Sequence, residues 1–190
     1  MLVPCTVPDR SAPPPRAMTP VATEPAAAVS LPWSPELALQ HAELDATHQE
    51  FVALLGQTEL APDDGLMERL QALFEHTVEH FAMEDSWMQA SAFAPVNCHG
   101  MQHRVVIQTL EELLRRGRED GDLALVREIL PELGKWFAQH AQTMDAALAW
   151  HLDQVGFDPA TGQMQRTAQQ GQEDQSLKAT SSCGSASCSS

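Results

Sequence analysis

The sequence predicts an all-α protein: an up-down-up-down four-helix bundle with disordered N- and C-terminal tails. Residues 33–156 show helical periodicity, and no stretch among them has a convincing strand pattern. Four periodic segments are separated by short breaks rich in proline, glycine and aspartate. Helices joined by short connections pack antiparallel to their neighbours, which is the arrangement of such a bundle.

The first two helices are expected over 35–57 and 65–90. Pro35 is acceptable in a first turn, where its missing amide hydrogen costs nothing. The breaker "APDDG" then ends the first helix, and Asp63 or Asp64 within it can act as the N-cap of the second.

The third helix is expected to follow "FAPVN", with Asn97 as its cap, and to end at "RRGREDGD". The fourth is expected over 122–153. It contains Pro131, which lacks an amide hydrogen and should therefore kink the helix or divide it in two.

Two segments of biased composition flank the predicted domain. Residues 1–32 are rich in Pro and Ala, and residues 157–190 are rich in Gln, Gly and Ser. Both contain few large apolar groups to offset the entropy of ordering, so both are predicted to be disordered. Cys183 and Cys188 could bind metal or form a small disulfide loop, but their Ser-rich context favours a disordered tail.

Charge and hydropathy exclude several classes of partner. The formal net charge of −15 argues against nucleic acid, since phosphate binding needs a basic surface. No apolar run is long enough to span a membrane. The stretch "MLVPCTVPDR" lacks the basic segment and apolar run of a secretory signal. We therefore expect a cytoplasmic protein that binds neither nucleic acid nor membranes, and the sequence identifies no protein partner.

Each predicted helix carries histidine or carboxylate side chains on its otherwise apolar inward face. They are His48 in the first helix, His80 and Glu84 in the second, His99 and His103 in the third, and His140 and Asp145 in the fourth. Imidazole binds first-row transition metals well, and a carboxylate can bridge two of them. Burying the ionised groups without partners would cost several kcal/mol. A mononuclear zinc site uses three or four ligands, so seven predict two metal ions.

Each of these fragments is a weak signal by itself. An isolated His–His or His–Glu pair at i, i+4 is more often a surface pair or a satisfied polar pair in the core. The prediction of a metal site depends on the combination, in which all four helices contribute to their buried faces.

The spacing of the last two candidate ligands predicts an irregularity in the fourth helix. Asp145 is five residues after His140, so on a regular helix their side chains would point about 140° apart. An apolar stripe ends at His140 and another begins at Asp145, and one extra residue between them would bring the two into line. We therefore predict a π-bulge between residues 140 and 145, a feature often found at functional sites.

The same segments resemble the signatures of the hemerythrin family. The matching pieces are "LDATHQEF", "HFAMED", "HGMQH" and "WFAQHAQTMD". They follow the family patterns D-x-x-H, H-F-x-x-E, H-x-x-x-H and W-x-x-x-H-x-x-x-x-D in the same order. Trp33 also resembles the aromatic residue common before the family's first helix. The resemblance covers residues 33–153 and fills all seven ligand positions.

The resemblance implies a non-haem centre of two iron ions (Fe²⁺/Fe³⁺) with an oxo or hydroxo bridge. Three histidines would hold one iron, two would hold the other, and two carboxylates would bridge them. The first set is His99, His103 and His140, the second is His48 and His80, and the bridges are Glu84 and Asp145. The iron with two histidines would keep an open position for dioxygen.

The resemblance also implies an apolar pocket that keeps water and protons away from dioxygen. By position its lining would be Phe51, Phe81, Trp136, Phe137 and Ala141. Ordinary core packing is a compatible interpretation of these residues, and for Trp136 it is an equally good one.

Reversible dioxygen binding for storage, delivery or sensing is the function that the resemblance implies, without substrate turnover. A di-iron enzyme that reacts with peroxide or nitric oxide is the alternative, and iron storage or detoxification is a third interpretation. A ferritin-like oxidase fits less well, because those bundles use carboxylate-rich sites with repeated E-x-x-H patterns. His41, His76 and His151 lie outside the ligand set, and His76 is expected to be a flanking residue.

Overall fold

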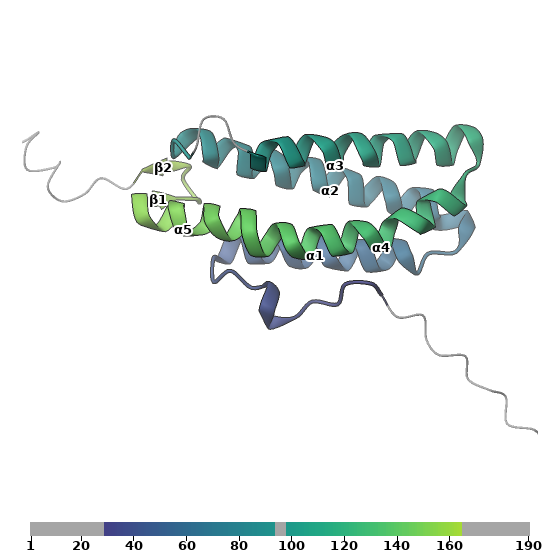
Figure 1. Ribbon diagram of the computed structural model, residues 1–190, viewed down its shortest axis with the longest axis horizontal. Helices are drawn as coiled ribbons and strands as arrows, with labels where there is room; N and C mark the ends of the chain where they lie inside the picture. The colour runs from purple at the N-terminus through teal and green to yellow at the C-terminus, as the bar shows by residue number, and fades with distance from the viewer. Residues whose placement is uncertain (1–28, 94–97, 165–190) are drawn as a thin grey trace, which may run out of the picture.

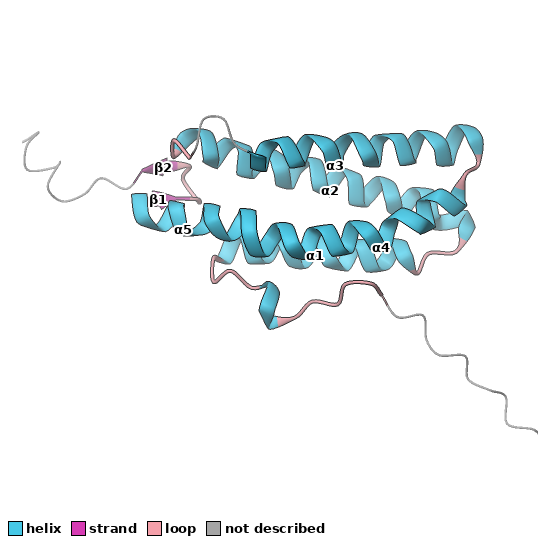
Figure 2. Cartoon of the chain, in the orientation of Figure 1, coloured by secondary structure: helices cyan, strands magenta, loops and turns pink. Residues whose placement is uncertain are grey.

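The computed structural model describes residues 29–93 and 98–164. Within them, four long helical segments lie side by side, and each runs antiparallel to the next (Figure 1). Their bounds are α1 Ala42–Glu59, α2 Asp63–Ala90, α3 Cys98–Arg115 and α4 Leu123–His140, the last continuing into α5 Ala146–Val155. The predicted all-α four-helix bundle is confirmed (Figure 2). Within the described ranges no helix combines the length and apolar character needed to cross a membrane. The predicted disorder of the tails concerns mainly residues 1–28 and 165–190, which lie outside the described residues.

The first helix begins later than predicted. Pro35 opens only a short 3-10 turn, η1 (Pro35–Leu37), and the predicted helix start at residue 35 is wrong. The chain breaks because Gln40 adopts a φ of 60°, which is incompatible with a continuous right-handed helix. His41 then caps α1, since its extended backbone lets the side-chain Nδ1 accept a hydrogen bond from the Leu44 amide at 3.4 Å.

The other helix starts agree with the prediction more closely. The N-cap of α2 is Pro62, so neither Asp63 nor Asp64 has that role. Both aspartates lie in the first turn, where the helix dipole favours negative charge. Asp122 caps α4 by accepting a hydrogen bond from the Leu125 amide at 3.2 Å. The predicted cap of α3, Asn97, lies outside the described residues.

The fourth helix is interrupted by a π segment rather than at its proline. α4 continues through Pro131, because the buried residues Leu130 and Leu133 on either side of it anchor the helix in the core. The predicted π-bulge is confirmed: η3 (Ala141–Asp145) is a π-helix between α4 and α5. A second π segment, η2 (Arg116–Asp120), follows α3 and was not predicted.

Buried apolar side chains form two clusters along the bundle. One cluster contains Leu44 of α1 and Trp87 of α2. The other contains Phe51 of α1 and Phe81 of α2. Between these pairs the sequence places histidines and a glutamate, including His48 on α1. The bundle therefore encloses a polar layer between two apolar ones.

A short hairpin extends the ordered part of the chain past residue 156. Strands β1 (Phe157–Asp158) and β2 (Gln163–Met164) pair antiparallel after α5. Phe157 is buried, and its ring centroid lies 6.5 Å from that of Trp87. The structure differs here from the predicted start of the tail at 157, because this buried aromatic side chain anchors the following residues.

The segment before α1 packs over two glycines, one on α1 and one on α4. A Cβ at Gly56 would lie 3.1 Å from Val29 Cγ1. A Cβ at Gly134 would lie 2.6 Å from Ser30 Oγ and 3.2 Å from Leu55 Cδ2. The close approach of this segment to the bundle therefore depends on the missing side chain at Gly134.

Replacing Gly134 with alanine is expected to lower the free energy of unfolding by about 1–3 kcal/mol, the usual effect of overpacking. The added methyl group would displace Ser30 and Leu55. Urea unfolding measures the change. Gly65→Ala is the matched control, because its nearest contact would be an ordinary 3.9 Å from Pro62. There we expect no loss, or a gain of up to about 1 kcal/mol from helix propensity. Equal losses in the two variants would contradict the packing argument.

Candidate metal centre

The seven predicted ligands lie together in the polar layer between the two apolar clusters. None is more than 2% exposed. All four helical segments contribute: His48 from α1, His80 and Glu84 from α2, His99 and His103 from α3, and His140 and Asp145 from α4 and η3. The fold thus brings every predicted ligand to one place.

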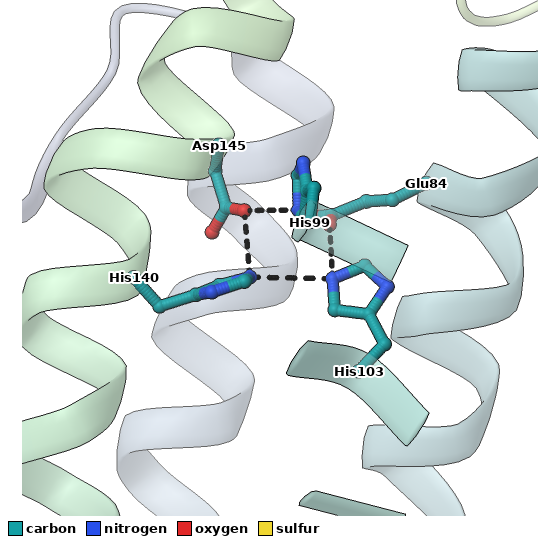
Figure 3. A group of neighbouring side chains, drawn as sticks. All are labelled: Glu84, His99, His103, His140 and Asp145. Carbon is teal, nitrogen blue, oxygen red and sulfur yellow. Dashed lines mark hydrogen bonds and ion pairs between the residues drawn. The ribbon is translucent and has the colours of Figure 1, made fainter. Parts of the chain in front are cut away.

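The seven residues form two overlapping groups in which the ligand atoms lie within 4.8 Å of one another. The five-residue group consists of Glu84, His99, His103, His140 and Asp145 (Figure 3). The three-residue group consists of His48, His80 and Glu84. A carboxylate that belongs to both groups is placed where it could bridge two metal ions.

The two oxygens of Glu84 face different imidazoles. Oε1 lies 2.8 Å from His80 Nε2 and 3.9 Å from His48 Nε2. Oε2 lies 3.1 Å from His99 Nε2 and 3.2 Å from His103 Nε2. Each oxygen is therefore directed to the histidines of one group.

The two oxygens of Asp145 also face different imidazoles, and the π segment η3 places this side chain in the cluster. Its Oδ2 lies 3.2 Å from His48 Nε2, while Oδ1 lies 2.9 Å from His99 Nε2 and 3.2 Å from His140 Nε2. On a regular helix Asp145 would point away from His140. The π segment accommodates the extra residue, and so both side chains reach the same cluster.

Paired charges occupy the cluster in the metal-free protein. Burial lowers the pKa of His48 and of His99, but contacts with Asp145 and Glu84 outweigh it and raise both pKa values to about 9. Burial raises the pKa of each carboxyl group, but the surrounding imidazoles hold both pKa values below their ordinary values. Burial lowers the pKa of His140, which favours its neutral, ligating form.

Several buried polar atoms of the cluster make no hydrogen bond with the described residues. They include both ring nitrogens of His48 and both oxygens of Asp145. Of these, His48 Nε2 and Asp145 Oδ2 lie 3.2 Å apart as an ion pair. Buried polar atoms without hydrogen bonds are rare in native proteins and call for an explanation. Coordination of metal ions would satisfy these nitrogen and oxygen donors, so the cluster fits the two-metal centre that its composition predicts.

Binding of two metal ions is expected to release about two protons per chain at pH 7, because imidazole binds metal only when deprotonated. The two protons would come from His48 and His99, whose pKa values are about 9. Anaerobic calorimetric titration of the metal-free protein with Fe²⁺, in two buffers of different ionisation enthalpy, measures this number. It should fall as the pH is raised through 9, and a number independent of pH would contradict these protonation states.

Two residues that sequence analysis did not identify contact predicted ligands from outside the cluster. Asp85 Oδ1 lies 3.1 Å from Nδ1 of His103. Gln102 Oε1 lies 3.1 Å from Nδ1 of His140 and accepts a hydrogen bond from Trp136 Nε1 at 3.3 Å. Ligating histidines generally need an acceptor at the second nitrogen. A search of the sequence for such acceptors could have found Asp85 and Gln102, because Asp85 follows Glu84 directly and Gln102 directly precedes His103.

Four of the five predicted pocket residues are fully buried beside the imidazoles. Phe137 stacks on Phe51 with ring centroids 4.0 Å apart, and it makes a T-shaped contact with His48 at a centroid distance of 5.2 Å. Phe81 stacks on His103 at 3.9 Å. The fourth, Ala141, begins η3 and has no exposed surface.

The fifth predicted pocket residue, Trp136, is only partly buried. Its ring stacks on His140 with centroids 4.5 Å apart. It also lines a cavity of about 290 Å³ together with Gln102 and His140. Trp136 therefore contacts the outer side of a predicted ligand, His140.

The three remaining histidines have other structural roles. His41 caps α1 and is buried. His76 Nε2 lies 3.2 Å from the carbonyl oxygen of Thr47, and His151 Nε2 lies 3.0 Å from that of Ser91. None of the three belongs to either ligand group, and His76 is a flanking residue of the cluster.

Comparison with known proteins gives a consistent result. Residues 40–149, which include the whole cluster, match the family model described as hemerythrin HHE cation binding domain. The chain is 40% identical over 126 residues to a bacteriohemerythrin of Ralstonia nicotianae, covering 66% of this chain and 91% of that protein. It is 23% identical over 140 residues to a bacteriohemerythrin of Stenotrophomonas maltophilia, covering 70% and 90%.

Proposed function

This chain belongs to the hemerythrin family, and we propose that it is a non-haem di-iron protein that binds dioxygen reversibly, for storage, delivery or sensing. The observation that carries the proposal is the division of the two Glu84 oxygens between two sets of imidazoles. A single metal ion would not need both sets. Two ions with a shared carboxylate would use every donor in the cluster.

The assignment of ligands follows the two groups. One iron would be held by three imidazoles and the other by two, with both carboxylates and an oxo or hydroxo group between them. The three are His99, His103 and His140, the two are His48 and His80, and the carboxylates are Glu84 and Asp145. When bound, the irons would supply electrons to dioxygen and take them back on its release. The iron held by only two histidines would have one protein ligand fewer than the other. The coordination position left open on that iron is the proposed place for dioxygen.

Aromatic side chains determine the surroundings of that position. Phe137 contacts the rings of both His48 and His80, with centroids 5.2 and 6.3 Å away. Phe51 stacks behind Phe137, and both have no exposed surface. A lining of phenyl groups excludes water and proton donors, which favours release of dioxygen over its irreversible reduction.

The alternative, a di-iron enzyme that reacts with peroxide or nitric oxide, would gain from a proton donor beside the site. His76 is a candidate by position, since its ring centroid lies 6.1 Å from that of His80. Its Nε2 already contacts the Thr47 carbonyl, and burial lowers its pKa, so it is a poor proton donor near neutral pH. The lack of a suitable proton donor at His76 favours the carrier over the enzyme. The open position proposed beside the two-histidine set favours the carrier over simple iron storage or detoxification, which needs no such position.

Optical spectra of the iron-loaded protein test the proposal. We expect an absorption band that appears when the anaerobic ferrous protein is exposed to air and disappears on evacuation, through repeated cycles. Irreversible bleaching, or steady consumption of peroxide or nitric oxide, would favour the enzyme instead. Iron uptake well beyond two ions per chain would favour storage.

A further inference from the structure

The five imidazoles of the cluster differ in what their second ring nitrogen contacts. In His103 the Nδ1 atom lies 3.1 Å from the Asp85 carboxylate, and in His140 it lies 3.1 Å from the Gln102 amide oxygen. Both acceptors therefore serve histidines of the five-residue group.

Among the residues that the structure describes, the other three histidines have no such acceptor. Nδ1 of His48, His80 and His99 is buried and makes no hydrogen bond with any described residue. Within residues 29–93 and 98–164, neither imidazole of the three-residue group has an outer acceptor, whereas two of the three imidazoles in the five-residue group have one.

An acceptor at Nδ1 prepares a histidine for metal binding. It keeps the proton on Nδ1, leaves Nε2 free as the ligand atom, fixes the orientation of the ring and makes the imidazole a stronger donor. His140 is further restrained, because Trp136 stacks on its ring and donates to the same Gln102 oxygen. The five-residue group is the better prepared of the two.

We propose that Asp85 and Gln102 are positioning residues that set the order of metal loading, so that the five-residue group binds the first metal ion and the three-residue group the second. This inference rests on the two-metal centre proposed above. The first ion would fix the Glu84 carboxylate through Oε2, which lies 3.1 Å from His99. Oε1, 2.8 Å from His80, would then be held in place for the second ion.

A cavity beside the five-residue group is consistent with this order. It measures about 290 Å³ and opens next to a ligand of that group, and its lining consists of Gln102, Trp136, Gln139, His140, Thr143 and Met144. In the three-residue group, the buried ring of Phe137 contacts both His48 and His80, and Phe51 stacks on Phe137. A hydrated ion can therefore approach the five-residue group more directly.

Anaerobic titration of the metal-free full-length chain with Co²⁺, followed by calorimetry and optical absorption, tests the order. We expect two binding steps of different affinity. His103→Ala should remove the tighter step, and His80→Ala should remove the weaker one. Asp85→Ala and Gln102→Leu should each weaken the tighter step by about 10–100-fold, the usual effect of losing an outer acceptor, and leave the weaker step unchanged.

Matched variants separate positioning from a general effect on the fold. Gln102→Glu keeps an acceptor and should restore the tighter step. Gln108→Leu makes the same type of change at an exposed position on α3, the helix that carries Gln102, and should leave both steps unchanged. Glu68→Ala repeats the charge change of Asp85→Ala at an exposed position on the same helix, and should also change neither step.

The outcomes distinguish this inference from the proposed function. Two ions of equal affinity, loss of the tighter step in His80→Ala, or equal weakening of both steps in Asp85→Ala would overturn the proposed order. Binding of fewer than two ions by the unmodified chain would overturn the di-iron proposal itself.

Discussion

Replacing Glu84 with alanine is expected to remove at least one of the two metal ions and to destabilise the metal-free bundle. Glu84 belongs to both candidate ligand groups, so its loss would deprive each of the two proposed ions of a donor. In the metal-free protein it is also one of two buried carboxylates that balance the protonated His48 and His99. Breaking such a buried pair costs about 3–5 kcal/mol.

Iron analysis after anaerobic reconstitution and urea unfolding of the metal-free protein measure the two effects. His76→Ala is the control, because His76 lies two helical turns before Glu84 on α2 and belongs to neither ligand group. It should retain both ions. Glu84→Ala protein that keeps two ions per chain would contradict the shared role of this carboxylate.

The destabilisation by Glu84→Ala should depend on pH with a definite sign. His48 and His99 have pKa values raised to about 9, so their pairing with carboxylates stabilises the fold fully below pH 6.5, the ordinary pKa of histidine. This contribution is lost as the pH rises through 9. The difference in unfolding free energy between the variant and the unmodified protein should therefore shrink above pH 9.

Deleting Thr143 is expected to preserve the metal centre, whereas deleting Ala147 is expected to destroy it. Both residues are exposed and lie within seven positions of His140. η3 accommodates one residue more than a regular helix. Without Thr143 the segment can become a regular α-helix in which Asp145 stands four positions after His140, on the same face.

Deleting Ala147 allows no such solution. If the π segment persists, Leu148 and Leu152 turn about 100° away from the core, and loss of a buried leucine costs about 2–5 kcal/mol. If the π segment becomes regular, the leucines keep their places, but Asp145 turns about 100° from its present position and points about 140° away from His140. Either the fold or the metal site is lost.

Metal content and thermal unfolding of the two deletion variants measure these outcomes. The Thr143 deletion should bind two ions and unfold at a temperature close to that of the unmodified protein. Loss of metal from this variant to the same degree as from the Ala147 deletion would mean that the π conformation itself is required, beyond the register that it restores.

The π segment shows what the sequence could predict. Its position followed from a conflict between two apolar stripes, one ending at His140 and one beginning at Asp145, which only an extra residue could resolve. The inward positions of the seven ligands followed from helical periodicity. Their division into two sets followed from the family resemblance, and no property of the isolated helices could have predicted it.

Other features depend on contacts that helical periodicity does not encode. The start of α1 is set by a left-handed residue, Gln40, and by the cap from His41, and neither has a local sequence signature strong enough to outweigh the proline before them. The acceptors Asp85 and Gln102 could be recognised only once α2, α3 and α4 were placed around the cluster. Long-range packing decides which of many polar residues face a ligand.

Anomalous diffraction at the iron edge, from crystals of the protein reconstituted anaerobically with Fe²⁺, tests the central claim most directly. Two peaks are expected in the polar layer, both beside Glu84. One should lie among His99, His103 and His140, and the other beside His48 and His80. A single peak, or peaks outside this cluster, would contradict the assignment of a di-iron centre to these seven residues.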